Sequence, residues 1–283
     1  MKNCDIHIRD PFVLVHGGKY YMYGTRGATC WGEADGFDVF VGDDLENWDG
    51  PFAVFHNDGS FWADKHYWAP EVHEYRDAFY MFASFKKDGV NRGTQILRAD
   101  TPMGPFKPHS DGPVTPRDWG CLDGTLYISK EQKPYMVFCH EWTQVKDSEM
   151  CVMELSEDLT TAVGEPSLLF KASEQPGVHG WEGNFVTDGP FLRRLQSGTL
   201  IMIWSTQGAQ GYCQAVAVSD NGEIDGKWCL SPDLLFEKDG GHGMIFTGLD
   251  GQLYITLHAP NETPNERPFF YKLREAGDSF VLV

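Results

Sequence analysis

Short apolar runs alternate along this chain with clusters of Gly, Asp, Asn and Pro. The residues in these runs are apolar at successive positions instead of every third or fourth, which predicts strands and argues against long amphipathic helices. Apolar residues on both faces are typical of strands that pack between neighbouring sheets. Clear examples are Phe12–Val15, Phe79–Phe82, Tyr135–Phe138 and Leu200–Trp204.

One motif recurs five times: a polar residue (alanine in the second copy), a short apolar strand, a polar turn and an aromatic-rich strand. The copies begin at Asp10, Ala69, Asp123, Asp188 and His242, separated by 59, 54, 65 and 54 residues. Two weaker strand patterns follow within each copy. Four strands in a repeat of roughly 50 residues are typical of a β-propeller. The sequence therefore predicts an all-β fold, a five-bladed β-propeller with four-stranded antiparallel blades, formed by residues 1–283 as a single domain.

The first residue of each copy is expected to face the axis of the ring, because equivalent positions in equivalent blades point to one place. The carboxylates of Asp10, Asp123 and Asp188 and the imidazole of His242 would then converge there, with Ala69 contributing no chemistry. An Asp before Pro or Gly is by itself typical of a turn. Its recurrence at three axial positions is what favours an enzyme.

The charge of the chain narrows the possible partners. The 283 residues include 41 acidic and 23 basic side chains, for a net charge of −18. Binding to nucleic acid requires a basic surface for the phosphates, so we expect no nucleic acid partner. An anionic membrane is disfavoured for the same reason, and a neutral substrate or a bound cation fits better.

The cysteines and the N-terminal residues bear on location. The chain has seven cysteines, an odd number, which are scattered along it without any Cys-x-x-Cys spacing. This pattern predicts free thiols and a cytoplasmic location. No stretch is apolar enough for a signal peptide or a membrane span. Secretion stays open if a signal peptide has been removed.

Five segments, taken together and in order, resemble glycoside hydrolase family 43. They are Arg9–Phe12 with Gly18–Tyr23, Trp68–His73, Cys121–Gly124, Asp188–Pro190 and Gly241–Gly243. The resemblance covers nearly the whole chain. It implies a five-bladed propeller that hydrolyses glycans containing arabinose or xylose, with inversion at the anomeric carbon.

The resemblance also implies catalytic roles. Asp10 matches the general base, and Asp123 matches the residue that orients the acid and tunes its pKa. The family acid is usually Glu before Gly-Pro, whereas Asp188 stands there with one methylene fewer. Glu182 is therefore an alternative acid, and Glu141 is a more distant one. Inverting hydrolysis needs an acid and a base about 6.5–9.5 Å apart, which leaves room for a water.

Other residues are expected to bind substrate or an ion. In the resembled family the counterpart of His242 faces a central ion, often calcium, bound largely through water, so we expect an axial cation near His242 and no organic cofactor. Trp68 is expected to form a wall of the sugar pocket, and Glu182 to lie in that pocket. Arg267 resembles the family arginine that contacts sugar hydroxyls; the alternative is a surface salt bridge with Glu262 or Glu266.

Extra length in three segments (24–35, 107–121 and 171–186) is expected to form loops on the substrate face, and these carry Trp31, Trp119 and Trp181. Trp48 and Trp228 are expected to pack inside outer strands.

The leading hypothesis is an inverting exo-glycosidase that releases terminal α-L-arabinofuranosyl or β-D-xylosyl residues from plant-derived oligosaccharides. A glycoside phosphorylase would need a basic phosphate pocket, and the axial positions offer no Arg or Lys cluster. The non-enzyme alternative is a carbohydrate-binding propeller that has lost its general acid. The sugar, the linkage and the oligomeric state are not predicted.

Overall fold

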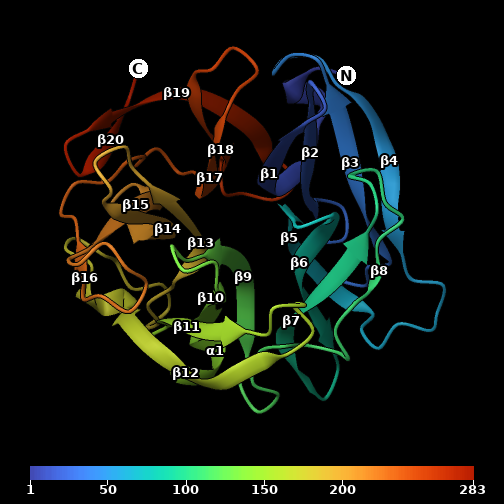
Figure 1. Cartoon of the computed structure of the whole chain (residues 1–283), viewed down its shortest axis with the longest axis horizontal. Helices are drawn as coiled ribbons and strands as arrows, with labels where there is room; N and C mark the ends of the chain where they lie inside the picture. Colours follow the sequence, from blue (N-terminus) through green and yellow to red (C-terminus); the bar gives the residue numbers. More distant parts are fainter.

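The computed structural model describes all 283 residues, and its strands form five sheets arranged as blades around a central axis (Figure 1). Each blade has four strands that pair antiparallel with their neighbours. The prediction of an all-β, five-bladed propeller is confirmed. In chain order the strands are β1 (Ile8–His16), β2 (Lys19–Arg26), β3 (Gly36–Gly42), β4 (Asp49–His56), β5 (Lys65–Tyr75), β6 (Ala78–Lys87), β7 (Val90–Ala99), β8 (Lys107–Pro108), β9 (Cys121–Ile128), β10 (Pro134–His140), β11 (Glu149–Leu155), β12 (Ala162–Lys171), β13 (Asp188–Arg194), β14 (Leu200–Gly208), β15 (Gly211–Ser219), β16 (Trp228–Leu230), β17 (Gly241–Thr247), β18 (Leu253–Ala259), β19 (Arg267–Ala276) and β20 (Ser279–Leu282).

Each blade is one contiguous stretch of chain that begins at the axis and runs outward. The first strands of the blades, β1, β5, β9, β13 and β17, lie closest to the centre of the ring (Figure 1). Since β1–β4 and β17–β20 are each complete sheets, the ring closes without exchanging a strand between its ends.

Aromatic side chains pack across the seam between the fifth blade and the first. The ring of Trp48 stacks on Phe270 at 5.8 Å between centroids, and Tyr20 meets Phe246 edge-on at 6.1 Å. Such pairs add stability beyond the apolar area that they bury. Trp48 and Trp228 are both buried, as their predicted packing in outer strands requires.

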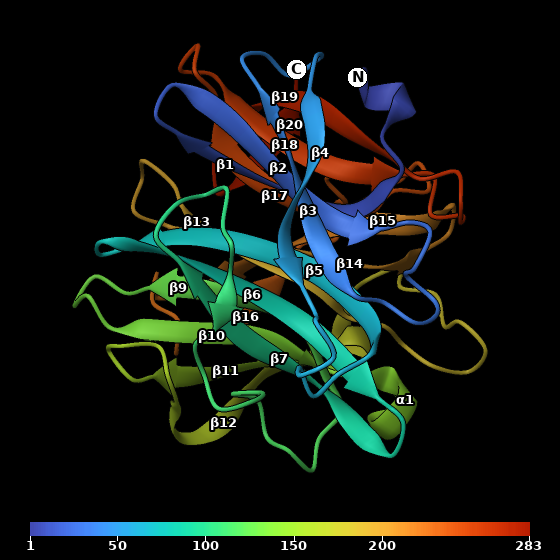
Figure 2. The same cartoon turned by 90° about the vertical axis from the view of Figure 1, so that its right-hand side faces the viewer.

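The loops that build the functional face project from one side of the ring. Figure 2 shows the short helix α1 (Trp142–Val145) on this side, with the loops 27–35, 175–187 and 260–266. Two 3-10 turns, η1 (Asn3–Asp5) and η2 (Ala172–Glu174), complete the secondary structure. No helix is both long and apolar enough to cross a membrane.

Every first strand carries a bulge at the same place. The pairing between the first and second strands of each blade breaks over two residues, and the first of these has a positive φ. A bulge of this kind re-aims a side chain and is common beside active sites. We call these positive-φ residues the axial residues: Asp10, Ala69, Asp123, Gly189 and His242, with φ of 53°, 46°, 56°, 47° and 52°.

The sequence-based alignment of the fourth copy is therefore wrong by one residue. Gly189, not Asp188, occupies the axial position, and Asp188 precedes the bulge opposite Ser205. Position 189 has to be glycine, because a Cβ there would lie 2.7 Å from the His242 ring. The motif misled because Asp188-Gly189 matches Asp123-Gly124, whereas the bulge is formed by Gly189 and Pro190, which match Asp10-Pro11.

Candidate active site

A cavity of about 610 Å³ opens at the loop-bearing end of the axis. Asp10, Asp123, Asp188 and His242 all line it, so the structure brings together the four side chains predicted to converge. Its walls come from every blade. The other lining residues are Arg9, Trp31, Trp68, Leu122, Glu141, Trp142, Trp181, Val186, Gln207, Tyr212, Asp239, Asn261 and Thr263.

Asp10 is held as a carboxylate. Thr25 Oγ1 accepts the Ala69 N–H at 2.7 Å, so its own proton is donated to Asp10 Oδ2 at 2.6 Å. The other oxygen, Oδ1, lies 3.2 Å from His242 Nδ1. Burial alone would raise the pKa of Asp10, but the positive charges of His242 and Arg9 outweigh it and lower this pKa below its ordinary value.

Asp188 is held toward the protonated form. Burial raises the pKa of Asp188 to about 6, with help from the charge of Asp10, while His242 and the hydrogen bond from Tyr212 oppose the rise. Tyr212 Oη donates to Asp188 Oδ2 at 3.0 Å. A carboxyl that keeps its proton to this pH can act as a general acid.

Asp123 is buried, and the charges of Asp10 and Asp188 both act on it. Its Oδ2 accepts the Gly189 N–H at 3.0 Å. Burial raises the pKa of Asp123 to about 7, and the negative charges of Asp188 and Asp10 act in the same direction. The charges of Asp123 and Asp188 oppose each other's ionisation, so the two carboxyls titrate as a coupled pair near neutrality.

His242 supplies a buried positive charge. Burial would lower its pKa, but the carboxylates of Asp10, Asp123 and Asp188 outweigh it and raise the pKa of His242. Its Nδ1 faces Asp10 at 3.2 Å and Asp123 at 3.8 Å. No three His, Cys, Asp or Glu side chains are placed to bind a metal together, so we do not assign His242 as a metal ligand. The predicted axial cation stays a prediction, and no chemical step below depends on it.

Tryptophans form two sides of the pocket. Trp68 lies in the wall, as predicted, with the Arg92 guanidinium 3.6 Å from its ring centre and His66 stacked in parallel at 5.0 Å. Trp31 packs edge-on against Trp68 at 5.2 Å. Aromatic rings held this firmly suit the apolar faces of sugars.

A second aromatic pair lies in the third and fourth blades. Trp142, on α1, and Trp181, in the loop before β13, meet edge-on at 5.1 Å, and both line the cavity. Glu141 also lines the pocket, where its Oε1 lies 3.4 Å from Arg92 Nε. This ion pair gives Glu141 a charged partner in the pocket wall.

Two predicted site residues lie elsewhere. Arg267 does not reach the pocket: its Nε donates to Cys4 O at 2.8 Å and its Nη1 to Pro264 O at 3.0 Å, so it ties η1 to the fifth blade. Arg267 makes no salt bridge with Glu262 or Glu266, and it does not line the pocket in which the sugar contact was expected. Glu182 is exposed and does not line the cavity, so Asp188 is the better-placed acid.

Two residues that line the pocket, Arg9 and Tyr212, and the buried His258 were not among the site residues predicted from the sequence. Arg9 bonds Asn261 Oδ1 at 2.8 Å, pairs with Glu266 and lies 5.3 Å over Trp31. Its place directly before Asp10 was the available signal.

Tyr212 lies on β15, the third strand of its blade, and His258 lies on β18, the second strand of its blade. Neither position carries such a signal. Their rings stack at 5.7 Å, and His258 Nδ1 accepts the Asp10 N–H at 3.1 Å. Burial lowers the pKa of His258 to about 3, which keeps it neutral and able to accept this bond.

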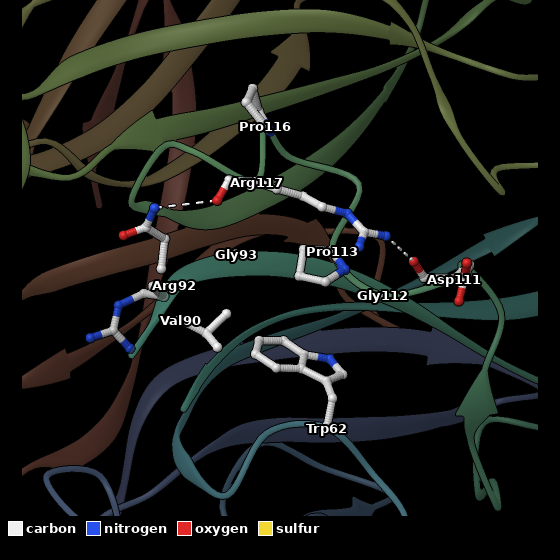
Figure 3. A pocket seen from close by; sticks show the side chains of 10 residues that line it. Trp62, Val90, Arg92, Gly93, Asp111, Gly112, Pro113, Pro116 and Arg117 are labelled. Carbon is white, nitrogen blue, oxygen red and sulfur yellow. Dashed lines mark hydrogen bonds between the residues drawn. The ribbon is translucent and has the colours of Figure 1, made fainter. Parts of the chain in front are cut away.

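A smaller cavity of about 300 Å³ lies between the β6–β7 hairpin and the loop 111–117 (Figure 3). Its polar groups are used within the loop: Asn91 Nδ2 donates to Arg117 O at 3.2 Å, and Arg117 Nη2 donates to Asp111 O at 2.8 Å. Asp111, the one carboxylate in its lining, is exposed. This cavity therefore lacks the buried acid and base that the central pocket contains.

Comparison with known proteins agrees with the geometry. A family model described as glycosyl hydrolases family 43 matches residues 5–276. The structure is similar to that of an endo-arabinase from Bacteroides thetaiotaomicron, with 39% sequence identity, a TM-score of 0.91 and 98% of each chain covered. An α-L-arabinofuranosidase from Lactobacillus brevis shares the fold at 18% identity and a TM-score of 0.76, covering 100% of this chain and 97% of that one.

Among curated proteins, an extracellular exo-α-(1→5)-L-arabinofuranosidase of Cellvibrio japonicus is 23% identical over 175 residues. The match covers 56% of this chain and 46% of the relative, so it spans about half the length of that protein. Because the relative is described as extracellular, the predicted cytoplasmic location has no support in these comparisons.

Proposed function

The chain belongs to glycosyl hydrolase family 43 and is a glycoside hydrolase, and we propose that it hydrolyses α-L-arabinofuranosyl linkages with inversion, with Asp10 as base and Asp188 as acid. The observation that carries this proposal is a single pocket in which two aspartates have pKa values displaced in opposite directions. Such a separation assigns acid and base to chemically identical side chains.

In the proposed reaction, the Asp10 carboxylate takes a proton from a water whose oxygen bonds to the anomeric carbon. The bond from that carbon to the leaving oxygen breaks, and its electron pair stays on the oxygen. Asp188 gives its proton to this oxygen. Proton exchange with solvent then restores ionised Asp10 and protonated Asp188.

The neighbours of the pair support these roles. His242 and Arg9 keep Asp10 ionised, with His242 facing Oδ1 and the Thr25 hydroxyl donating to Oδ2. The charge of Asp188 raises the pKa of Asp123, and because like charges act on each other reciprocally, an ionised Asp123 favours protonation of Asp188.

Arabinose is the proposed sugar because the relatives at 39% and 23% identity are named an endo-arabinase and an exo-α-(1→5)-L-arabinofuranosidase. A neutral furanoside chain also agrees with the net charge of −18. Exo action on terminal residues remains the prediction from the sequence.

Endo action is a second candidate, favoured by the two tryptophan pairs. Trp31 and Trp181 are both largely exposed at the rim, and they come from different blades. Rings at two places on the rim suit a chain that extends from the cleavage point in both directions. Products from a linear arabino-oligosaccharide separate the two modes: monosaccharide alone indicates exo action, and a ladder of shorter oligosaccharides indicates endo action.

The proposed reaction is tested by following hydrolysis of an arabino-oligosaccharide by proton NMR. The anomer that appears first must have the inverted configuration, and Asp10→Asn must abolish its formation. First appearance of the retained anomer, or hydrolysis by Asp10→Asn at the rate of the parent protein, would refute the proposal. Metal analysis of the purified protein, in the same preparation, tests the predicted cation.

A further inference from the structure

A ring of side-chain acceptors on the second strands holds the axial residues. In each blade, one second-strand residue pairs with the residue just before the bulge. We call these the acceptor positions: Thr25, Ser84, Cys139, Ser205 and His258.

Four acceptor positions bind the backbone N–H of the axial residue in the next blade. Thr25 Oγ1 binds the Ala69 N–H at 2.7 Å, Ser84 Oγ binds that of Asp123 at 2.8 Å, and Ser205 Oγ binds that of His242 at 2.7 Å. His258 Nδ1 closes the ring at the Asp10 N–H, at 3.1 Å. The bonds fix the positive-φ backbone from which the catalytic side chains project.

The third blade breaks this rule. Its acceptor position is Cys139, which is fully buried and makes no hydrogen bond to the next axial residue, Gly189. Sulfur is a weak acceptor compared with a hydroxyl oxygen. Burial, with the charges of Asp123 and Asp188, raises the pKa of Cys139 well above its ordinary value, so the thiol stays neutral.

The N–H that Cys139 does not bind is the one that binds Asp123. Gly189 donates to Asp123 Oδ2 at 3.0 Å, directly beside Asp188 in the chain. We propose that Cys139 is a positioning residue of the active site, whose weakly accepting thiol leaves the Gly189 N–H to fix the Asp123 carboxylate beside the acid. This inference rests on the proposed roles of Asp123 and Asp188.

Exchanging the thiol for a hydroxyl tests the proposal. In Cys139→Ser the third blade gains the acceptor that three other blades already have, and the hydroxyl competes for the Gly189 N–H. Asp123 then loses a hydrogen bond that stabilises its charged form, so its pKa rises. Cys139→Ala removes the sulfur without adding an acceptor and leaves the Gly189–Asp123 bond in place.

The expected effect on the pH profile of kcat is specific, because near neutrality the coupled pair of Asp123 and Asp188 carries a single proton. When Asp123 binds that proton more tightly, Asp188 holds it less often, and kcat on an arabino-oligosaccharide falls by about threefold to tenfold below neutrality. The loss of activity with rising pH begins at a higher pH in Cys139→Ser than in the parent protein, by up to about one unit. At alkaline pH the kcat profiles of Cys139→Ser and the parent protein meet. Both carboxyls are then mostly ionised, so the small fraction of molecules with Asp188 protonated depends only on the pKa of Asp188.

Other charged or titratable groups act on Asp123 from the neighbouring strands and stay unchanged in these variants. They are His242 on β17, Asp188 on β13, Asp10 on β1, Arg92 on β7 and Tyr212 on β15. Cys151→Ser, a buried thiol-to-hydroxyl change on β11, controls for burying a hydroxyl in the same blade. Titration of the Asp123 carboxyl carbon by NMR reads the pKa without activity.

The expected result is a changed pH profile and a raised Asp123 pKa in Cys139→Ser, with parent-like values in Cys139→Ala and Cys151→Ser. Identical profiles in both Cys139 variants, whether changed or unchanged, overturn the inference, because packing alone would explain them. If Asp188→Asn in the parent background hydrolyses the oligosaccharide normally, the proposed function fails instead. If Cys139→Ser does not fold, the reverse exchange is made at Ser84, whose hydroxyl accepts the Asp123 N–H. Ser84→Ala and Ser84→Cys both weaken this bond, loosen the Asp123 backbone and are expected to lower kcat. A parent-like kcat in both variants overturns the inference.

Discussion

At the residue scale, two aspartates in one pocket differ in the charge of what surrounds them. Asp10 has the positive His242 and Arg9 for neighbours, whereas Asp188 is half-buried beside Tyr212, and the negative charge of Asp10 acts on it. Burial raises the pKa of both, and only Asp10 has enough positive charge nearby to reverse the effect. The difference in role therefore arises from environment, since the side chains are the same.

The first prediction is a bell-shaped pH dependence of kcat/KM. Activity is lost as pH falls and Asp10 becomes protonated, with this limb below about pH 4 because its pKa is lowered. Activity is lost again as pH rises through about 6 to about 7, where the Asp188–Asp123 pair gives up its proton. Initial rates on an arabino-oligosaccharide measure both limbs. A basic limb above about pH 9 would contradict the assignment of a carboxyl acid.

The second prediction concerns the cost of keeping Asp123 charged. Its folded pKa is raised to about 7, so the parent protein loses stability as pH rises from about 4 toward 7, while the unfolded chain is already ionised. Asp123→Asn keeps an acceptor for the Gly189 N–H and carries no charge. We expect it to be more stable than the parent by about 2 kcal/mol at pH 8 and equal to it near pH 4, although inactive. Urea unfolding at pH 4 and pH 8 measures the difference in the free energy of unfolding between Asp123→Asn and the parent. If Asp123→Asn is less stable than the parent at pH 8, neighbouring positive groups compensate the Asp123 charge and the prediction is wrong.

At the scale of elements, the bulges on the first strands decide which side chains face the pocket. The repeat in the sequence was enough to predict the blades and the convergence of Asp10, Asp123 and His242. It was not enough to place the bulge in the fourth blade, because Asp-Gly and Gly-Pro both match the motif and only the pairing with β14 distinguishes them. Tyr212 could not be predicted as a site residue for a related reason. It lies on β15, and hydrophobic periodicity does not indicate which residue of a third strand extends to the axis.

The third prediction addresses the loop that carries Trp181. This side chain is 46% exposed at the rim and packs only edge-on against Trp142, so removing it leaves the core intact. Trp181→Ala is expected to raise KM for arabino-oligosaccharides by about tenfold, a loss of about 1.4 kcal/mol, and to leave hydrolysis of a small aryl arabinofuranoside unchanged. Trp119→Phe is a matched control, because Trp119 stacks on His140 and does not line the pocket. Equal effects on long and short substrates would place Trp181 at the cleavage point instead.

At the scale of the whole molecule, the ring depends on contacts across one seam, since no strand is exchanged between its ends. Arg267 contributes there by binding three backbone carbonyls, of Cys4, Pro264 and Glu266. Nearby, Arg9 pairs with Glu266 and joins the seam to the pocket wall. Arg9 therefore contributes both to ring closure and to the active site, whereas Arg267 contributes only to ring closure.

The fourth prediction separates these two arginines. Arg267→Ala is expected to lower the free energy of unfolding by about 1–2 kcal/mol, and Tm by a few degrees, without changing kcat or KM. Arg9→Ala is expected to lower both stability and kcat, because Asp10 loses a positive neighbour. Thermal unfolding and steady-state kinetics on both variants provide the comparison. A raised KM with unchanged Tm in Arg267→Ala would restore the sugar-binding role first expected for this residue.

The assignment of Asp188 as the acid is tested most directly by varying the leaving group. A general acid matters for an oligosaccharide, whose leaving oxygen needs a proton, and matters little for a dinitrophenyl arabinofuranoside, whose leaving group departs as an anion. Asp188→Ala is therefore expected to lose about a thousandfold or more in kcat/KM on the oligosaccharide and less than about tenfold on the dinitrophenyl substrate, whereas Asp10→Ala loses activity on both. Equal losses on the two substrates in Asp188→Ala, or the selective loss in Glu182→Ala instead, would contradict the account.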